Sequence, residues 1–236
     1  MSPDDSGRTV RHFDHELADL RELLLEMAAR TEEMLRTSLK AVRERDPEAG
    51  DAAVEADHAI DSLEVEIENR AIQLLARRQP MATDLRRIVA TIKISNDLER
   101  MGDHAVNIAQ CARRLASGFP LPDLPELQRM ADVASGMLRD AIEAFIEGDA
   151  GLARDICARD DEVDRFNDSI FRIMLTVMAE NNASISAALQ MLLVSRNLER
   201  IADLATNLGE DVIYIVEARS IKHHAEDAAN EGEYDQ

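Results

Sequence analysis

The sequence predicts an all-α protein made of two tandem three-helix bundles, and three observations support this fold class. Hydrophobic residues form 45% of the 236 residues but aromatic residues only 3%, which favours helices over sheets. The nine glycines and six prolines fall mainly between long segments with apolar residues at helical spacing. The phrase NDLERMGDHAVNIA at 96–109 returns as RNLERIADLATNLG at 196–209, with six of fourteen positions identical. This internal repeat predicts two copies of one helical unit.

The first half contains three segments with helical periodicity. The stretch RDPEAGD at 45–51 predicts the end of the first helix, because it combines proline with glycine. Pro80 predicts the break before the third helix, for which Thr83 or Asp84 is the expected N-cap. The expected helices cover residues 12–45, 52–78 and 83–116.

The second half repeats this organisation after a proline-rich connection. The stretch SGFPLPDLP at 117–125 holds three of the six prolines and predicts a linker. Three further helices are expected near 126–147, 151–181 and 183–222. The predicted organisation is a first repeat with an N-terminal extension (1–116), a linker (117–125), a second repeat (126–222) and a disordered acidic tail (223–236).

Charge and cysteine usage restrict the class of protein. A formal net charge of −20 argues against nucleic acid as a partner, because phosphate backbones would be repelled. No apolar run approaches the roughly 18 residues needed to cross a bilayer, so we expect no membrane insertion. The polar start MSPDDSG does not resemble a signal peptide. Cys111 and Cys157 are isolated thiols, which fits a reducing, cytoplasmic location.

The candidate site consists of acidic pairs spaced four residues apart, so that both carboxylates lie on one helix face. With 47 acidic residues, about nine such pairs arise by chance, and a single pair therefore means little. Four of the pairs are significant because they occupy matching positions in the repeat: each half has one pair early in its second helix and one midway along its third. The pairs are Asp57/Asp61, Glu99/Asp103, Asp160/Asp164 and Glu199/Asp203.

These acids are candidate metal ligands. Glu99 and Asp103 fall in the same helical stripe as Ile88, Ile92 and Val106, where a carboxylate needs a compensating charge. If the second and third helices of each unit are antiparallel, a pair from each can converge on one site. Sites made only of oxygen ligands suit divalent or trivalent ions such as Mg²⁺, Mn²⁺ or Fe³⁺ better than zinc.

Two alternatives stay open from the spacing alone. The acids could instead form ion pairs with Arg86, Arg87, Arg100 and Arg200, which would make the chain a structural helical adaptor. A carboxylate-bridged metalloenzyme is disfavoured, because neither repeated pair has the E-x-x-H spacing of di-iron bundle enzymes. His104 has Leu204 as its counterpart, so it is not expected to be a symmetric ligand.

The run LLARRQPMATDLRRIVATIKISNDLERMGDHAVNIA at 74–109 resembles the signature of the PhoU family, regulators of phosphate-specific transport. The resemblance extends over essentially the whole chain, because that family also has two three-helix repeats joined by a short linker. Its recurring E/D-x-x-x-D pairs correspond to the four acidic pairs of this sequence.

The resemblance implies a cytoplasmic, non-enzymatic regulator that binds metal ions at these pairs. It also implies that the chain restrains phosphate uptake by contacting the ATPase subunit of a phosphate ABC transporter and a membrane sensor histidine kinase. We therefore expect a homodimer with these two partners. The second repeat departs from the family phrase, because Leu204 replaces the histidine of GDHA and the RRQP run is missing. We expect the two repeats to differ in metal affinity.

Overall fold

The computed structural model describes residues 3–78 and 80–218, and all the regular structure in these residues is helical. A short 3₁₀ turn, η1 (Asn182–Ser184), precedes the last helix. The six long helices are α1 (Pro3–Glu44), α2 (Pro47–Arg78), α3 (Ala82–Ala116), α4 (Pro125–Glu147), α5 (Ala150–Glu180) and α6 (Ile185–Glu217).

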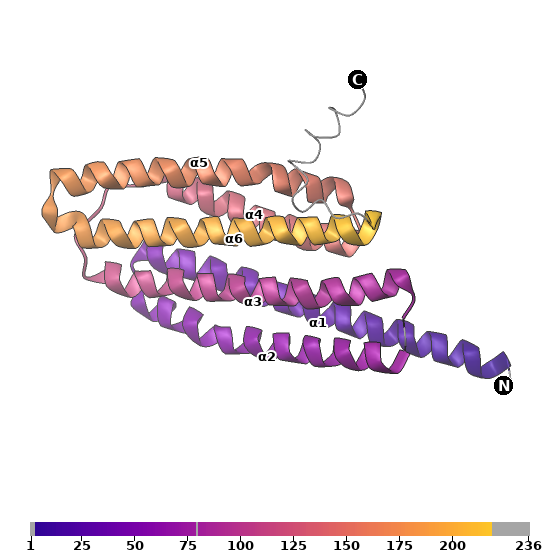
Figure 1. Ribbon diagram of the computed structural model, residues 1–236. Coiled ribbons are helices and arrows are strands. Elements are labelled where there is room, and N and C mark those ends of the chain that lie inside the picture. The colour runs from indigo at the N-terminus through magenta and orange to yellow at the C-terminus, as the bar shows by residue number, and fades with distance from the viewer. Residues whose placement is uncertain (1–2, 79, 219–236) are drawn as a thin grey trace, which may run out of the picture.

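The helices form two three-helix bundles that lie side by side (Figure 1). Helices α1–α3 make up the first bundle and α4–α6 the second, and the two bundles meet mainly where α3 packs on α6. Short connections make successive helices within each bundle antiparallel. The α2–α3 turn and the α5–α6 turn consequently lie at opposite ends of the molecule (Figure 1). The predicted all-α, two-bundle fold class is confirmed.

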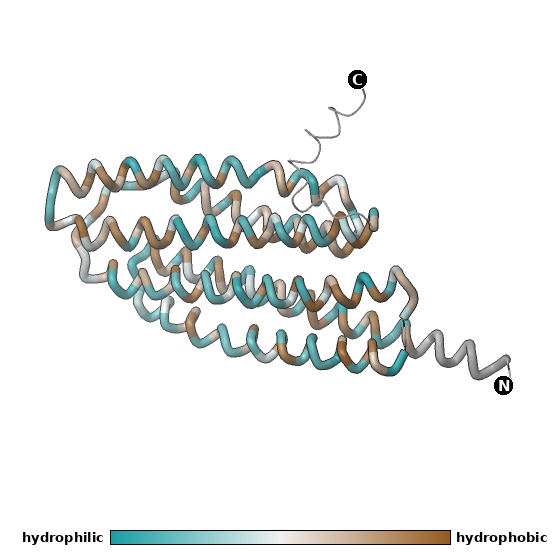
Figure 2. Tube along the Cα trace, viewed as in Figure 1, coloured by the Kyte–Doolittle hydropathy of each residue, from teal (hydrophilic) through white to brown (hydrophobic). Residues whose placement is uncertain are grey.

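The core explains why these segments are helices. Hydrophobic residues recur along each helix between hydrophilic ones (Figure 2), as an amphipathic helix requires. In α3, Ile88, Leu98, Met101 and Ile108 are almost completely buried. None of the described helices has a stretch apolar enough to span a membrane.

Two glycines let helices approach closely at equivalent places. A Cβ atom on Gly50 of α2 would lie 2.9 Å from the carbonyl oxygen of Ala109 on α3. A Cβ atom on Gly209 of α6 would lie 3.0 Å from the carbonyl oxygen of Ala153 on α5. The repeat aligns Gly50 with Ala153 and Ala109 with Gly209. Each bundle therefore has one glycine and one alanine at this contact, on opposite helices.

Several helix ends differ from the expected positions. Helix α1 begins at Pro3 rather than near residue 12, and α6 ends at Glu217 rather than near residue 222. Helix α2 already begins at Pro47, because the chain reverses at Arg45, whose φ of 53° is left-handed. The carboxylate of Asp46 then accepts hydrogen bonds from the first backbone N–H groups of α2, those of Glu48 and Ala49. The acidic tail at 223–236 lies outside the described residues.

The expected N-cap of α3 was wrong. The N-cap is Met81, whose side chain makes no capping hydrogen bond, and Thr83 and Asp84 lie inside the first turn. Asp84 in this turn still interacts favourably with the helix dipole.

Candidate functional site

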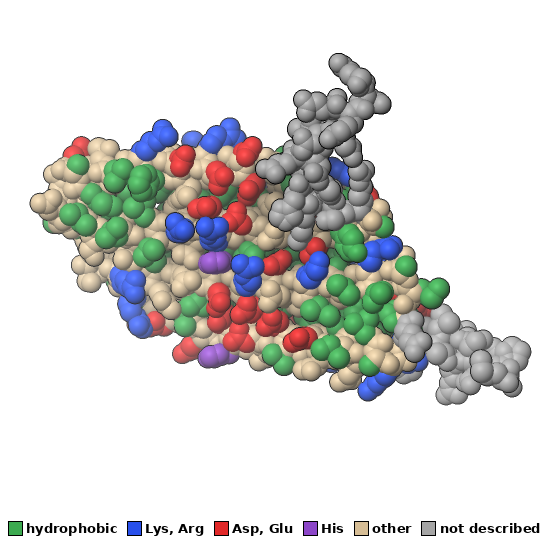
Figure 3. All heavy atoms as spheres, viewed as in Figure 1, with side chains coloured by type: hydrophobic (Ala, Val, Ile, Leu, Met, Phe, Trp, Pro, Cys, Tyr) green, Lys and Arg blue, Asp and Glu red, His purple; other side chains and the backbone are tan. Residues whose placement is uncertain are grey.

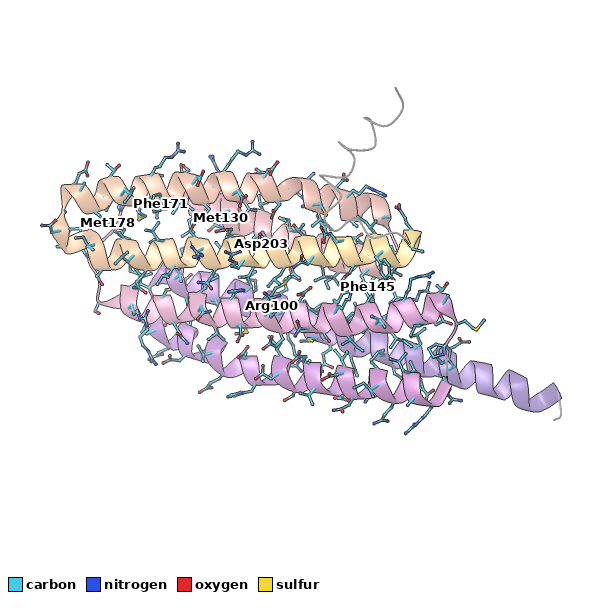
Figure 4. All side chains as sticks on the ribbon, in the orientation of Figure 1. Arg100, Met130, Phe145, Phe171, Met178 and Asp203 are labelled. Atoms are coloured by element: carbon cyan, nitrogen blue, oxygen red, sulfur yellow. The ribbon has the colours of Figure 1, made fainter. Side chains whose placement is uncertain are left out.

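Four of the eight acids lie on α2 and α3 of the first bundle, and the other four lie on α5 and α6 of the second. Figure 3 shows acidic side chains gathered over α2–α3 and over α5–α6, with basic side chains between them. Figure 4 places Arg100 and Asp203 near the middle of α3 and α6. Cluster 1 is defined as Asp57, Asp61, Glu99 and Asp103; cluster 2 is defined as Asp160, Asp164, Glu199 and Asp203.

The carboxylates of cluster 1 come together from both helices. A Cβ atom on Gly102 of α3 would lie 3.2 Å from Oδ1 of Asp57, so the Asp57 carboxylate of α2 lies against α3 at this glycine. Burial raises the pKa of Asp57 above its usual value, and the charges of Asp61 and Asp103 raise it further. Burial, followed by the charge of Asp103, raises the pKa of Glu99 to about 7. Burial and the mutual repulsion of these carboxylates therefore favour the protonated forms of Asp57 and Glu99.

Cluster 1 contains a fifth carboxylate that the sequence reasoning missed. Glu64 lies on α2, three residues after Asp61, and its charge contributes to the raised pKa of Glu99. Its Oε1 accepts a hydrogen bond of 3.3 Å from Nδ2 of Asn96. The spacing of four residues that identifies the acidic pairs does not include Glu64, which follows Asp61 by three. The repeat aligns Glu64 with Asn167 of the second bundle.

Cluster 2 is partly compensated by its neighbours. Nδ2 of Asn167 donates a hydrogen bond of 2.7 Å to Oε2 of Glu199. Arg200 forms an ion pair of 2.8 Å with Asp203. Burial raises the pKa of Asp160 to about 6, helped by the charges of Asp203 and Asp164. The second cluster therefore keeps some electrostatic repulsion, but less of its charge is unpaired than in cluster 1.

The alternative of an ion-pair network holds only for Arg200. Arg100 pairs with Asp97 at 3.5 Å instead of with Asp103, and Arg87 lies 4.0 Å from Asp84. The guanidinium of Arg86 bonds to the hydroxyl of Thr83 at 3.4 Å. The part of this alternative that pairs the clusters with Arg86, Arg87 and Arg100 is therefore not supported. Seven of the eight acids make no ion pair with another described residue.

The donor chemistry of both clusters fits hard cations, because every ligand would be a carboxylate oxygen. Within residues 3–78 and 80–218, however, no three Asp, Glu, His or Cys side chains converge closely enough to hold one ion. The carboxylates of each cluster lie on a common surface but do not converge on one position. Metal binding therefore stays a prediction. The stripe expected to be apolar lies at the edge of the core, since Asp103 and Leu85 are exposed.

One histidine and the two cysteines are the other side chains considered as ligands or nucleophiles. Nδ1 of His104 lies 2.9 Å from Oδ1 of Asn197, so this histidine connects α3 to α6. Burial raises the pKa of the Cys111 thiol and of the Cys157 thiol. Neither cysteine is therefore an activated nucleophile.

Comparison with known proteins agrees with this architecture. A family model described as the PhoU domain matches residues 24–112 and again 127–212. A phosphate-specific transport system accessory protein PhoU homolog of Clostridium acetobutylicum is 35% identical over 90% of this chain and 98% of its own length. A homolog with the same description from Caulobacter vibrioides is 39% identical over 86% of this chain and 88% of its own.

Solved structures agree in the same way. The crystal structure of PhoU from Pseudomonas aeruginosa superposes with a TM-score of 0.85 at 35% identity, covering 88% of this chain and 100% of that chain. The phosphate transport system regulatory protein PhoU from Streptococcus pneumoniae superposes with a TM-score of 0.83 at 29% identity, covering 89% of this chain and 99% of that chain.

Proposed function

Because this chain belongs to the PhoU family of phosphate-transport accessory proteins, we propose that it restrains phosphate uptake and phosphate-starvation signalling in a metal-dependent way. In this proposal it acts in the cytoplasm as a homodimer and has no enzymatic activity of its own. Its partners are the ATPase subunit of a phosphate ABC transporter and a sensor histidine kinase.

The observation that carries the proposal is the uncompensated charge of cluster 1. Five carboxylates from two helices repel one another there, and the pKa of Glu99 is raised to about 7. A protein built only for stability gains nothing from such repulsion. A bound Mg²⁺, Mn²⁺ or iron ion would supply the missing positive charge and convert repulsion into ligation.

The two carboxylate-bearing helices suggest how a cation acts. An ion held by Asp57 and Asp61 of α2 and by Glu99 and Asp103 of α3 would cross-link these helices and fix their packing. Cluster 2 would bind an ion more weakly, because Arg200 and Asn167 already engage two of its carboxylates. The positive charge of the ion would also reverse the local field that an acidic group of a partner meets.

A binding experiment with the purified partners tests this function. We expect the chain to bind the transporter ATPase subunit and the sensor kinase with Mn²⁺ present, and to lose at least tenfold in affinity with chelator. The variant Glu99→Gln/Asp103→Asn should bind weakly under both conditions. A matched control is Glu22→Gln/Glu55→Gln, which removes two exposed carboxylates outside the clusters. Binding that ignores both chelator and the cluster variant would refute metal dependence.

The adaptor alternative is favoured by one observation, the pairing of Arg200 with Asp203. It predicts that chelator changes neither the melting temperature nor partner binding. Bound metal, in contrast, stabilises the folded state by mass action and should raise the melting temperature.

A further inference from the structure

Exposed apolar side chains concentrate at two ends of the molecule. Of the twelve large apolar side chains that are exposed in the described residues, nine lie toward the α2–α3 turn or the α5–α6 turn. Figure 3 shows them as two separate patches, and Figure 4 places Phe171 and Met178 on the α5 side of the second. The first tip is defined as Ile72, Arg77, Met81, Leu85, Arg87 and Val89. The second tip includes Ile185 and Leu189, which the repeat aligns with Leu85 and Val89.

The two tips differ in charge. Residues 70–89 hold five arginines and one aspartate, and of these arginines Arg70 pairs with Glu66 at 2.5 Å and Arg78 with Glu16 at 3.1 Å, which leaves Arg77, Arg86 and Arg87 against Asp84. The matching stretch 173–189 holds one charged residue, Glu180. Arg77 and Arg87 of the first tip are exposed and weakly engaged, with contacts of 3.3 Å to Gln73 and 4.0 Å to Asp84. The first tip is therefore apolar and basic, whereas the second is only apolar.

We propose that the first tip docks on the surface of an anionic lipid bilayer. Met81 is 81% exposed and stands at the turn that joins α2 to α3, so it can enter the interface ahead of these two helices. Leu85 and Val89 follow it at intervals of four residues on the same side of α3. Apolar side chains next to arginines are the combination that anchors proteins at anionic membrane surfaces.

The acidic clusters do not cancel this attraction. Glu99 lies fourteen residues after Leu85, about 21 Å along α3 at a rise of about 1.5 Å per residue. This separation exceeds the Debye length of about 8 Å at physiological ionic strength. The −20 charge of the whole chain would instead orient the molecule, with the first tip toward the membrane and the acidic face away from it.

Vesicle co-sedimentation of the full chain tests the proposal. We expect binding to vesicles of phosphatidylcholine with phosphatidylglycerol, and no measurable binding to phosphatidylcholine alone. Arg77→Gln/Arg87→Gln should weaken binding about 30-fold, since each arginine near an anionic surface contributes about a fivefold factor. Leu85→Glu/Val89→Glu should weaken it at least about tenfold, through lost apolar burial and added negative charge.

The second tip supplies the matched control. Ile185→Glu/Leu189→Glu changes the aligned, equally exposed positions and should leave vesicle binding unchanged. Circular dichroism and melting temperature verify that each variant is folded. The proposal is overturned if the folded chain ignores anionic vesicles, if neutral vesicles bind it as well, or if the control pair reduces binding as much as the first-tip variants. If the chain does not bind anionic vesicles, the proposal is wrong, and the basic and apolar first tip would fit an acidic protein surface instead.

Discussion

At the scale of single residues, the position of Glu64 and Asn167 distinguishes the two acidic clusters, in addition to the pairing of Arg200 with Asp203. Glu64 of the first bundle adds a fifth negative charge near Glu99, whereas Asn167 at the aligned position donates a hydrogen bond to Glu199. A glutamate and a shorter, neutral asparagine therefore have opposite electrostatic effects on equivalent glutamates. This exchange explains why cluster 1 is the stronger candidate for a cation.

Replacing Glu64 tests that explanation. Glu64→Asn removes one of the charges that raise the pKa of Glu99, so we expect this pKa to fall from about 7 toward its ordinary value of 4.5. A pH titration followed by NMR at the Glu99 carboxyl carbon measures the change. Asn167→Glu is the reciprocal variant, which removes the hydrogen bond to Glu199 and places a negative charge beside it. An unchanged Glu99 titration in Glu64→Asn would show that Glu64 lies outside the cluster.

Glu99 also predicts how stability depends on pH in metal-free protein. Because the folded state raises its pKa to about 7, Glu99 binds its proton more tightly when folded. Its stabilising contribution is complete below its unfolded pKa of 4.5 and is lost as the pH rises through about 7. The free energy of unfolding in chelator should therefore fall between about pH 5 and pH 8.

Glu99→Gln should remove most of that fall. At about pH 8 the variant should exceed the wild type by about 1 kcal/mol, a value that allows for solvent screening. Urea unfolding at several pH values measures the effect, with Glu22→Gln as the control at an exposed site. If Glu99→Gln keeps the full pH dependence, another group causes it.

Helix contacts are the feature that matters at the scale of elements. The glycine of this contact is on α2 in the first bundle and on α6 in the second, with an alanine opposite in both. The two helices can approach closely when one of the two facing residues is glycine and the other is alanine, whichever helix carries the glycine. The sequence contained both glycines, but their role depends on which backbone faces them, and periodicity alone does not reveal this.

A glycine substitution tests the close contact. Gly50→Ala should destabilise the protein by about 1–2 kcal/mol, because its Cβ would lie 2.9 Å from the Ala109 carbonyl oxygen and outweigh the better helix propensity. Gly136→Ala on α4 is the control, since the nearest atom to its Cβ would be a flexible arginine nitrogen at 3.8 Å. That control should stabilise by about 0.5–1 kcal/mol. Chemical denaturation distinguishes the two, and a stabilising Gly50→Ala would contradict the packing account.

The sequence predicted the helices better than their ends. Apolar periodicity and the repeat were sufficient for six helices and two bundles, because core packing decides both. The start of α2 depended on the left-handed Arg45, and α3 starts at an uncapped Met81, neither of which has a distinct sequence signal. The acid register was also predictable, whereas the partners of each acid depend on side-chain geometry. Asn167 and Arg200 illustrate this dependence.

The contact between α3 and α6 connects the two bundles at the scale of the whole molecule. Nζ of Lys93 lies 3.3 Å from Oδ1 of Asp211 and 5.8 Å from the centre of the Tyr214 ring. His104, next to Asp103 of cluster 1, contacts Asn197 of the second bundle. A change at cluster 1 therefore has a direct route, through adjacent residues of α3, to the packing of the bundles.

Removing the cation from this contact should cost stability. In Lys93→Met the carboxylate of Asp211, whose side chain is 4% exposed, loses a cationic partner, and we expect a loss of about 1–2 kcal/mol. Lys40→Met is the control, because Lys40 and Glu44 form an exposed pair at 3.9 Å on one helix. It should change stability by less than about 0.5 kcal/mol. Equal effects in urea unfolding would contradict a special role for the Lys93 contact.

The metal content of purified variants tests the central claim most directly. We expect wild-type protein and Glu22→Gln/Glu55→Gln to retain the same amount of Mn²⁺ per chain after gel filtration, as measured by mass spectrometry. Glu99→Gln/Asp103→Asn should lose most of it, Glu199→Gln/Asp203→Asn should lose less, and the fourfold variant should retain none. Wild-type metal content in the fourfold variant would contradict the assignment of the carboxylate clusters as cation sites.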